Sequence, residues 1–268
     1  MGRFERIIEV NKRHDVLEEI EKFNPYHDRA GRFSSSNGGG AGIAGGAAAG
    51  AQREYKKIDH AEAVAMAKSM GQDPRDMDDD DVENILRHLN SDGTKAEGYI
   101  GTANSFKINR NLRQNVPVEN MSEADQKTIE ALDRNMKPSP SDIVLYRMIG
   151  NSLFESLGIG DLDALDWEDK NEQAKMKQAI GKVYPNKGYT STSFQMDDNV
   201  FDTRPVQMVI KAPKGTKMLV SPDRDYGEIS EAEIVLARNS AMKVTNIAPR
   251  IEGGFLRGIT VEMEVLLD

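Results

Sequence analysis

The stretch SDIVLYRMIG, residues 141–150, marks the point at which the character of the sequence changes. It has strand length and an apolar composition, and the sequence before Pro138 has helical periodicity. Turn residues separate it from the further segments of strand length that follow: GYTSTSF (188–194), PVQMVIKAP (205–213), TKMLVSP (216–222), EAEIVLARNS (231–240), MKVTNIA (242–248) and ITVEMEVLL (259–267). We therefore expect a β-rich C-terminal part, interrupted by a helix over 171–183.

The sequence upstream of this point predicts helices. Apolar residues recur at helical spacing over 58–71, 76–90, 104–114 and 122–137. Gly71 is expected to end the first helix, and an aspartate run is expected to cap the second, because acidic side chains suit the positive end of the helix dipole. Helices first and strands after predict an α+β domain.

The first part of the chain has a different composition. Residues 3–23 predict an amphipathic helix, which Pro25 ends. A glycine- and alanine-rich stretch follows and includes a literal GxGxxG at 40–45, but it lacks the preceding strand and following helix of a dinucleotide-binding motif. We interpret it as a flexible linker. The predicted organisation is 1–36, a helix and docking segment; 37–54, a linker; and 55–268, the globular domain.

Composition excludes several classes of protein. The formal net charge of −9 argues against a protein that coats nucleic acid. The absence of cysteine excludes disulfides, thiolate metal sites and a cysteine nucleophile, and fits a reducing compartment. No apolar run approaches the ~20 residues of a membrane span, and the charged N-terminus does not predict a signal peptide. No metal or membrane is expected.

Arg147 is the first polar feature among the predicted strands. By alternation it shares a strand face with Ile143, Leu145 and Ile149. A permanent charge on an apolar face needs a partner, because unpaired buried charge is costly. A bound phosphate would suit the fork of the guanidinium, and a nearby carboxylate is the alternative.

Two further polar features lie in later strands. In GYTSTSF, Ser191 and Ser193 share one face and Thr192 takes the other, and such short hydroxyls can hold a neighbouring carboxylate. Glu231 and Glu233 lie on one face of EAEIVLARNS, with Ala232, Ile234 and Leu236 toward a core. Alone, this pair would also suit the solvated face of an edge strand.

The order LYR, STS, ExE resembles the arginine-serine-glutamate class of mono-ADP-ribosyltransferases, which includes the bacterial exoenzymes and arginine-specific toxins. YIGTANSFKINRNLR (99–113) resembles the helical lead-in of that family, and TIEALDRNMKPSPSDIVLYR (128–147) resembles its entry into the first strand. The likeness covers roughly 95–268. Met148 departs from it, because the family often has glycine after the strand arginine.

The resemblance implies a mixed two-sheet β core behind the helices, with an NAD+ cleft between the sheets. It also implies a role for each motif. Arg147 would hold the phosphate of NAD+, Ser191 would hydrogen-bond the catalytic carboxylate of Glu233, and Thr192 and Ser193 would support the cleft. Tyr226 and Gly227 would lie in the loop that meets the acceptor, with Glu231 at its end.

The chemistry agrees with these roles. Cleavage of the nicotinamide bond leaves an oxocarbenium-like ribose, as glycoside hydrolysis does, and a nearby carboxylate stabilises that charge. A second carboxylate can take a proton from an incoming nucleophile. Glutamate at 231 suits an arginine acceptor, because a protonated guanidinium is a poor nucleophile; in the family, glutamine there accompanies asparagine acceptors. A host protein is the expected acceptor, with nucleic acid, a small guanidino compound and water left open.

Two other classes remain open. One is a catalytically idle, NAD-binding domain, and the other is a structural phage protein that carries this domain. FNPYHDRAGRFSS (23–35) resembles an N-P-x-H-D-x-x-G-R-F segment of phage head-associated proteins, and an ordinary loop before a linker is the alternative. If the resemblance holds, residues 1–36 dock an effector to a phage head, and the protein is virion-associated, acts in the cytoplasm of a bacterial host, or both.

Overall fold

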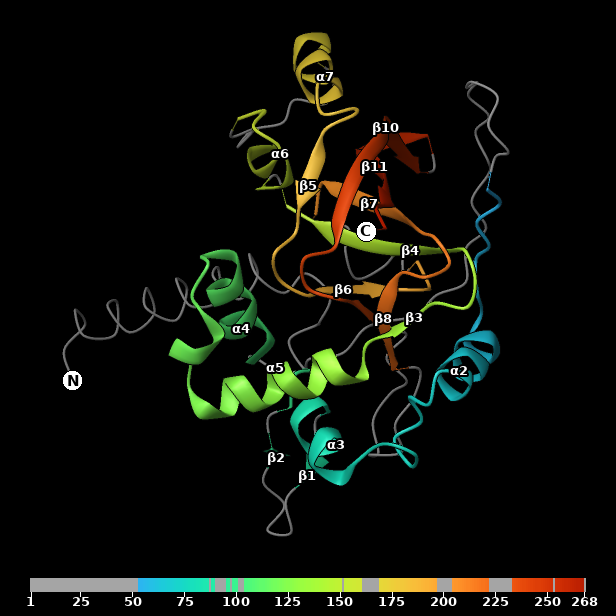
Figure 1. Ribbon diagram of the computed structural model, residues 1–268. Helices are drawn as coiled ribbons and strands as arrows, with labels where there is room; N and C mark the ends of the chain where they lie inside the picture. Colours follow the sequence, from blue (N-terminus) through green and yellow to red (C-terminus); the bar gives the residue numbers. More distant parts are fainter. Residues whose placement is uncertain are drawn as a thin grey trace, which may run out of the picture.

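The computed structural model describes most of the chain from Arg53 onward (Figure 1). The residues described are 53–86, 88–89, 95–96, 98–100, 104–150, 152–160, 169–196, 204–221, 233–252 and 254–267. The predicted N-terminal helix and the glycine-rich linker lie outside them.

Helices come first in the described chain, as expected from the sequence. They are α2 (His60–Ser69), α3 (Asp79–Ile85), α4 (Asn104–Arg113), the short 3-10 helix η1 (Val118–Asn120) and α5 (Glu123–Asn135), with α6 (Ser152–Ser156) and α7 (Lys170–Lys177) later. Local chemistry explains their ends. The Asp59 carboxylate accepts the backbone N–H of Glu62 at 2.8 Å, and Gly71 adopts a positive φ of 67° just beyond α2.

Helices α3 and α7 end well before the sequence predicted, and α6 was not predicted. The predicted helix over 76–90 ends at Ile85, because the carbonyl of that residue accepts the backbone N–H of Ile100 at 2.8 Å. Gly98 permits this approach, since a Cβ there would lie 2.3 Å from the Leu86 carbonyl oxygen. The predicted helix over 171–183 ends at Lys177, and a turn that includes Gly181 leads into a strand.

The strands form one nine-stranded sheet in the order β3-β8-β9-β6-β4-β7-β11-β10-β5, besides the two-stranded β1-β2 pair. Their bounds are β1 (His88–Leu89), β2 (Lys95–Ala96), β3 (Lys137–Pro138), β4 (Ile143–Ile149), β5 (Val183–Pro185), β6 (Thr190–Ser193), β7 (Val206–Ala212), β8 (Lys217–Ser221), β9 (Glu233–Leu236), β10 (Ala241–Glu252) and β11 (Phe255–Val265). Most neighbours are antiparallel, but β7 and β11 are parallel. The mixed α+β fold is therefore confirmed.

The sheet has a weak point between β4 and β6. A single registered pair, Tyr146 opposite Ser193, joins them, whereas β4 and β7 pair along their whole length. The sheet thus divides into a half with β3, β8, β9 and β6 and a half with β4, β7, β11, β10 and β5. Arg147 and the TSTS strand lie on either side of this junction.

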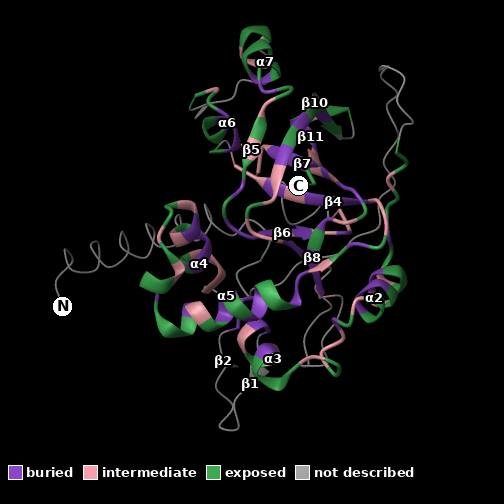
Figure 2. Ribbon diagram, viewed as in Figure 1, coloured by how far each residue is buried: buried purple, intermediate pink, exposed green. Residues whose placement is uncertain are grey.

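Two apolar clusters cover the sheet. The larger one joins β4, β7, β10 and β11 to residues of α2, α6 and α7, and it contains Ile143 and Leu145. The smaller one packs α3, α4 and α5 against one face of β8 and β9 through Leu219 and Val235. Figure 2 shows the central strands largely buried and the outer helix surfaces exposed.

The first residue of β9, Glu233, is not on a solvated edge. Strand β9 lies between β8 and β6, and all of its residues are buried. Ile234 and Leu236 enter the larger cluster, while Val235 enters the smaller one. The edge-strand interpretation of this glutamate is therefore wrong, because both faces of the strand are covered.

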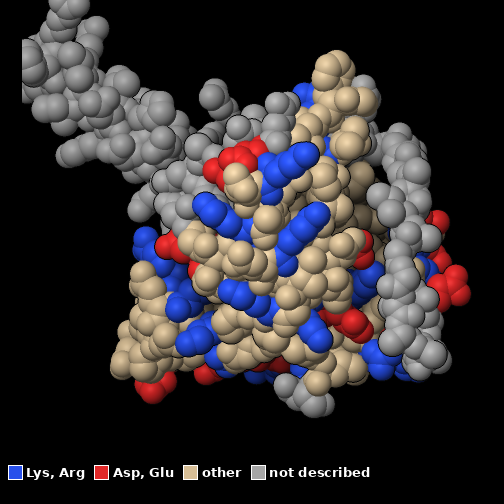
Figure 3. Space-filling view, turned by 90° about the horizontal axis from the view of Figure 1, so that it is seen from above, with Lys and Arg blue, Asp and Glu red and all other residues tan. Residues whose placement is uncertain are grey.

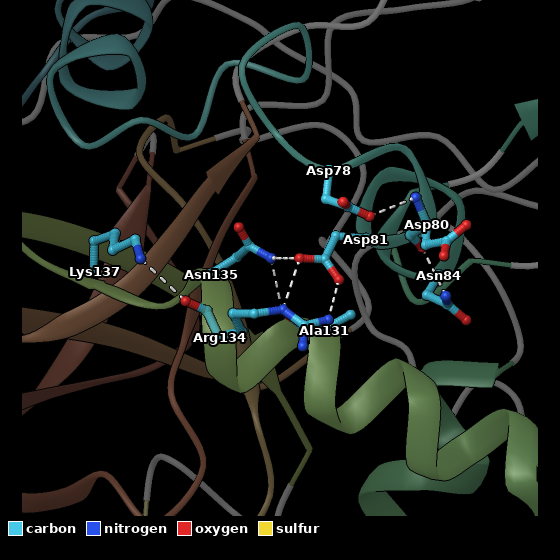
Figure 4. Close-up of polar contacts among 8 residues, drawn as sticks. All are labelled: Asp78, Asp80, Asp81, Asn84, Ala131, Arg134, Asn135 and Lys137. Carbon is cyan, nitrogen blue, oxygen red and sulfur yellow. Dashed lines mark hydrogen bonds and ion pairs between the residues drawn. The ribbon is translucent and has the colours of Figure 1, made fainter.

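Helices α3 and α5 are joined by a buried carboxylate (Figure 4). Asp81 accepts hydrogen bonds from Arg134 Nε at 3.0 Å and from Asn135 Nδ2 at 2.7 Å. The Arg134 contact holds the pKa of Asp81 below its usual range. Asp78 caps the helix by accepting the backbone N–H of Asp80 at 3.0 Å. The aspartate run thus serves as a cap, as expected, and also supplies an interhelical contact.

Charge is unevenly distributed on the surface. The end of the molecule at which α7 and β10 lie (Figure 1) carries many Lys and Arg side chains, seen from above in Figure 3. Exposed lysines on these elements include Lys170, Lys175, Lys177 and Lys243. The net charge of −9 is therefore not spread evenly. In the part of the chain described, no helix has the length and apolar composition needed to cross a membrane.

Candidate active site

Glu233 lies at the centre of the candidate site. The side chain is almost fully buried, with the residue 1% exposed, and Oε2 has no hydrogen-bond partner among the described residues. Strand register places Ser193 of β6 directly opposite on one side and Ser221 of β8 on the other. Directly opposite residues of an antiparallel pair share a face, so serines flank this carboxylate.

Burial controls the acidity of Glu233. Loss of solvation raises its pKa to about 7, against a hydrogen bond from the Ser191 side chain and the positive charge of Arg147, which both lower it. The carboxyl group therefore changes charge close to neutral pH. A side chain with this behaviour, in a buried position with an unused acceptor, is suited to catalysis rather than to structural support.

Arg147 contacts the serine strand across the weak junction of the sheet. The side chain is partly buried, and Nη1 donates to the backbone carbonyl of Ser191 at 3.0 Å. The residue pairs with Met208 of β7, on the core face that it shares with Ile143 and Leu145. Its guanidinium thus reaches from the β4 half of the sheet to the β6 half.

The TSTS strand uses its hydroxyls in different ways. Thr192 is buried and donates to the backbone carbonyl of Ile234 at 2.5 Å, which ties β6 to β9. Ser193 accepts the backbone N–H of Gln195 at 3.0 Å. Ser191 is the residue whose side chain reaches Glu233. The structure thus brings Arg147, Ser191, Ser193 and Glu233 together, and Thr192 points to the other face.

Arg113, the last residue of α4, is a candidate site residue that was not predicted from the sequence. Burial and the charge of Arg147 both lower the pKa of the Arg113 guanidinium, while the Tyr184 hydroxyl, which accepts a hydrogen bond from that guanidinium, raises it. Two guanidinium groups are therefore held in one partly desolvated region, which favours a bound anion. The signal was available in the sequence, because Arg113 is the arginine of the IN..LR motif.

The acceptor loop lies outside the described residues. Tyr226, Gly227 and Glu231 all fall between β8 and β9 in the undescribed segment 222–232. Their predicted roles therefore stay predictions. Among the described residues, no cluster of three or more His, Cys, Asp or Glu side chains could hold a metal ion.

Comparison with known proteins places this chain in a family. Residues 77–267 match the ADP-ribosyltransferase exoenzyme family, which is more than half of the chain. The chain therefore belongs to that family of ADP-ribosyltransferases. No curated protein is a match.

Solved structures of bacterial toxins share the fold. C3stau2 from S. aureus, solved with NAD, is 21% identical with a TM-score of 0.60, over 80% of this chain and 100% of its own. Plx2a, an ADP-ribosyltransferase toxin from Paenibacillus larvae, is 23% identical with a TM-score of 0.59, over 79% of this chain and 98% of its own. The Clostridium limosum C3 exoenzyme is 20% identical with a TM-score of 0.59, over 80% and 98%.

Proposed function

We propose that this protein is a mono-ADP-ribosyltransferase that moves ADP-ribose from NAD+ to arginine on a host protein and releases nicotinamide. The observation that carries the proposal is the environment of Glu233. Its carboxylate is buried, accepts a hydrogen bond from the Ser191 hydroxyl and lies close enough to Arg147 to be affected by its positive charge. Its Oε2 atom has no hydrogen-bond partner among the described residues. When NAD+ binds, a ribose hydroxyl would donate a hydrogen bond to this Oε2 atom.

The reaction follows from these groups. The bond between ribose C1′ and the nicotinamide nitrogen breaks, nicotinamide leaves with the electron pair, and positive charge develops on the ribose. Ionised Glu233 stabilises that charge. Arg147 and Arg113 neutralise the pyrophosphate, and Ser191 keeps the carboxylate oriented. A nucleophile then attacks C1′ and gives its proton to Glu231.

The first test removes the charge of Glu233. Glu233→Gln keeps the shape of the side chain but removes its charge, so NAD+ cleavage should fall by ~10²–10³. Nicotinamide release is measured on the purified protein, with circular dichroism showing that the variant is folded. Near-normal cleavage by this variant would refute the role of Glu233, and no cleavage by the unaltered chain would favour the idle, NAD-binding alternative.

The arginine acceptor is tested separately through Glu231. Water needs less activation than a guanidinium, which must lose a proton near its attack. Glu231→Gln should therefore reduce transfer to agmatine by ~10², the lower end for a lost general base, while NAD+ hydrolysis persists. Equal loss of both activities would mean that the glutamates act on NAD+ as one unit. Unchanged transfer would argue against an arginine acceptor.

The proposal includes a route of delivery. The segment NPYHDRAGRF, residues 24–33, supports a phage-borne effector in which residues 1–36 dock to the head and the enzyme acts in the host cytoplasm. Mass spectrometry of purified phage particles tests this idea. Absence of the chain from intact particles, when it is present in the infected cells, would refute virion association.

A further inference from the structure

A buried asparagine connects the two sides of the site. Asn109 of α4 is 8% exposed, and both ends of its amide are occupied. Oδ1 accepts the backbone N–H of Tyr189 at 2.8 Å, and Nδ2 donates to the Tyr99 hydroxyl at 2.7 Å. Because only the oxygen can accept an N–H, the first contact fixes the orientation of the amide. Both of these contacts are within the protein.

The two segments that Asn109 joins each contain a residue of the candidate site. Arg113 lies four residues further along α4, so it shares a helix face with Asn109. Tyr189 directly precedes β6, two residues before Ser191, and belongs to the smaller apolar cluster with Val235, the residue opposite Ser191. The Asn109 side-chain amide therefore connects helix α4, which carries Arg113, to the start of strand β6, which carries Ser191.

The surroundings leave this link little freedom. Gly188 lies so close that a Cβ there would be 2.7 Å from Asn109 Oδ1. The rings of Tyr99 and Tyr189 pack edge to face with centroids 5.5 Å apart. Burial raises the pKa of Tyr99, and the charges of Glu233, Arg113 and Arg147 all act on its hydroxyl. The link is thus built into the side of the site.

We propose that Asn109 is a positioning residue that holds helix α4 against strand β6, and so fixes the spacing between Arg113 and the Ser191–Glu233 pair. This inference rests on the proposed function for its catalytic consequence. The distance between the anion-binding and charge-stabilising groups decides whether the pyrophosphate and the ribose of NAD+ are held at once. A displacement of ~1 Å in such a site can cost ~10² in rate.

The test compares Asn109→Ala with Asn111→Ala, the same substitution on the same helix at a partly exposed position. Asn109→Ala should lower kcat/KM for NAD+ by ~10², with a rise in KM, because the two halves lose their spacing. Asn111→Ala should match the unaltered protein. Thermal melts give the folded fraction of each. A loss of kcat in Asn109→Ala that only follows the folded fraction, with KM unchanged, would overturn the proposal.

Hydrogen exchange supplies a readout that needs no catalysis. The Tyr189 amide should exchange faster in Asn109→Ala, whereas Asn109→Asp, which keeps an acceptor for that amide, should restore its protection. Gly188→Ala should reproduce Asn109→Ala, since its methyl group displaces the Asn109 side chain. Unchanged exchange of the Tyr189 amide in both Asn109→Ala and Gly188→Ala would refute the link itself. Lack of NAD+ cleavage by the unaltered chain would instead refute the proposed function.

Discussion

Glu233 couples activity to pH at the scale of a single residue. Its pKa of about 7 means that the ionised form, which the chemistry needs, becomes dominant only as the pH rises through neutrality. We therefore expect kcat/KM for NAD+ to rise from pH 6 to pH 8 and then level off. Initial rates of nicotinamide release across this range check it. A profile that is flat from pH 5 upward would mean that the site keeps Glu233 ionised.

The same residue should make stability change in the opposite direction. The pKa of Glu233 is raised from 4.5 to about 7 by burial, so between these values the folded protein holds a proton that the unfolded chain has released. Stability must therefore fall as the pH rises through this window. Glu233→Gln removes the effect and should stabilise the protein at pH 8 by on the order of 3 kcal/mol, with little change at pH 4.

Urea unfolding of both proteins at the two pH values measures this difference. Glu119→Gln, at an exposed glutamate of η1, is the matched control and should show no pH-dependent gain. An equal effect of Glu233→Gln at both pH values would mean that packing, rather than ionisation, accounts for the change.

Arg147 provides the third residue-scale expectation. Its partly buried guanidinium lies in one region with that of Arg113, so we expect it to bind phosphate more than it supports the fold. Arg147→Ala should weaken NAD+ binding by ~10-fold or more, since charge-assisted bonds to phosphate are strong. Calorimetry with NAD+ and a thermal melt are compared. A collapsed melt with normal affinity in the folded fraction would show a structural arginine.

At the scale of residues, the sequence predicted the features that depend only on alternation along one strand. Alternation placed Arg147 on an apolar face and separated Thr192 from its neighbouring serines, and both features are present in the structure. It gave no role to Arg113 or Asn109, although both lie in the IN..LR motif, because their roles depend on residues distant in the sequence: Tyr189 for Asn109, and Tyr184 and Arg147 for Arg113. Alternation also left open whether Glu233 lies on a solvated edge strand, because the order of strands in the sheet decides whether a strand is at its edge.

At the scale of elements, the buried Asp81 should matter more than its exposed neighbours. Its side chain is 5% exposed, whereas the Arg134 side chain that binds it is 63% exposed. Asp81→Asn should cost about 1–3 kcal/mol at pH 7, because charged hydrogen bonds between α3 and α5 are lost. The folded-state pKa of Asp81 is lowered, so its contribution is present above the unfolded value of 3.8 and disappears as the pH falls through the folded one.

Chemical denaturation at pH 7 and at pH 2 tests this contact. Asp80→Asn, one residue earlier and exposed, is the control and should change stability little. An equal cost for both variants would mean that the acidic first turn acts only through the helix dipole.

The order and type of most elements could be read from the sequence, but their pairing could not. Periodicity predicted all the helices except α6 and η1, together with strands β4 and β6 to β11, because buried faces impose their spacing. The sequence did not reveal that β9 lies between β8 and β6, or that a single pair joins β4 to β6. Both depend on which strands lie side by side, which no local pattern specifies.

At the scale of the whole molecule, the N-terminal part should be dispensable for catalysis. The glycine-rich stretch over 38–50 predicts a flexible connection, and such linkers transmit little. The first described residues contact the rest of the domain. The Tyr55 hydroxyl donates to the Glu264 carboxylate at 2.7 Å. The backbone N–H of Lys56 donates to the Asp142 carbonyl, and the Lys56 carbonyl accepts the backbone N–H of Val144. A chain that begins at Arg53 keeps these contacts.

Such a chain should cleave NAD+ at the rate of the full protein, whereas a chain that begins at Ile58 should melt at a lower temperature because it lacks Tyr55 and Lys56. Steady-state kinetics and thermal melts are measured on the full protein and on both shortened chains. If the chain beginning at Arg53 is folded but inactive, the first 52 residues contribute to the enzyme, and the helix predicted over 3–23 must act on the domain rather than only on a docking partner.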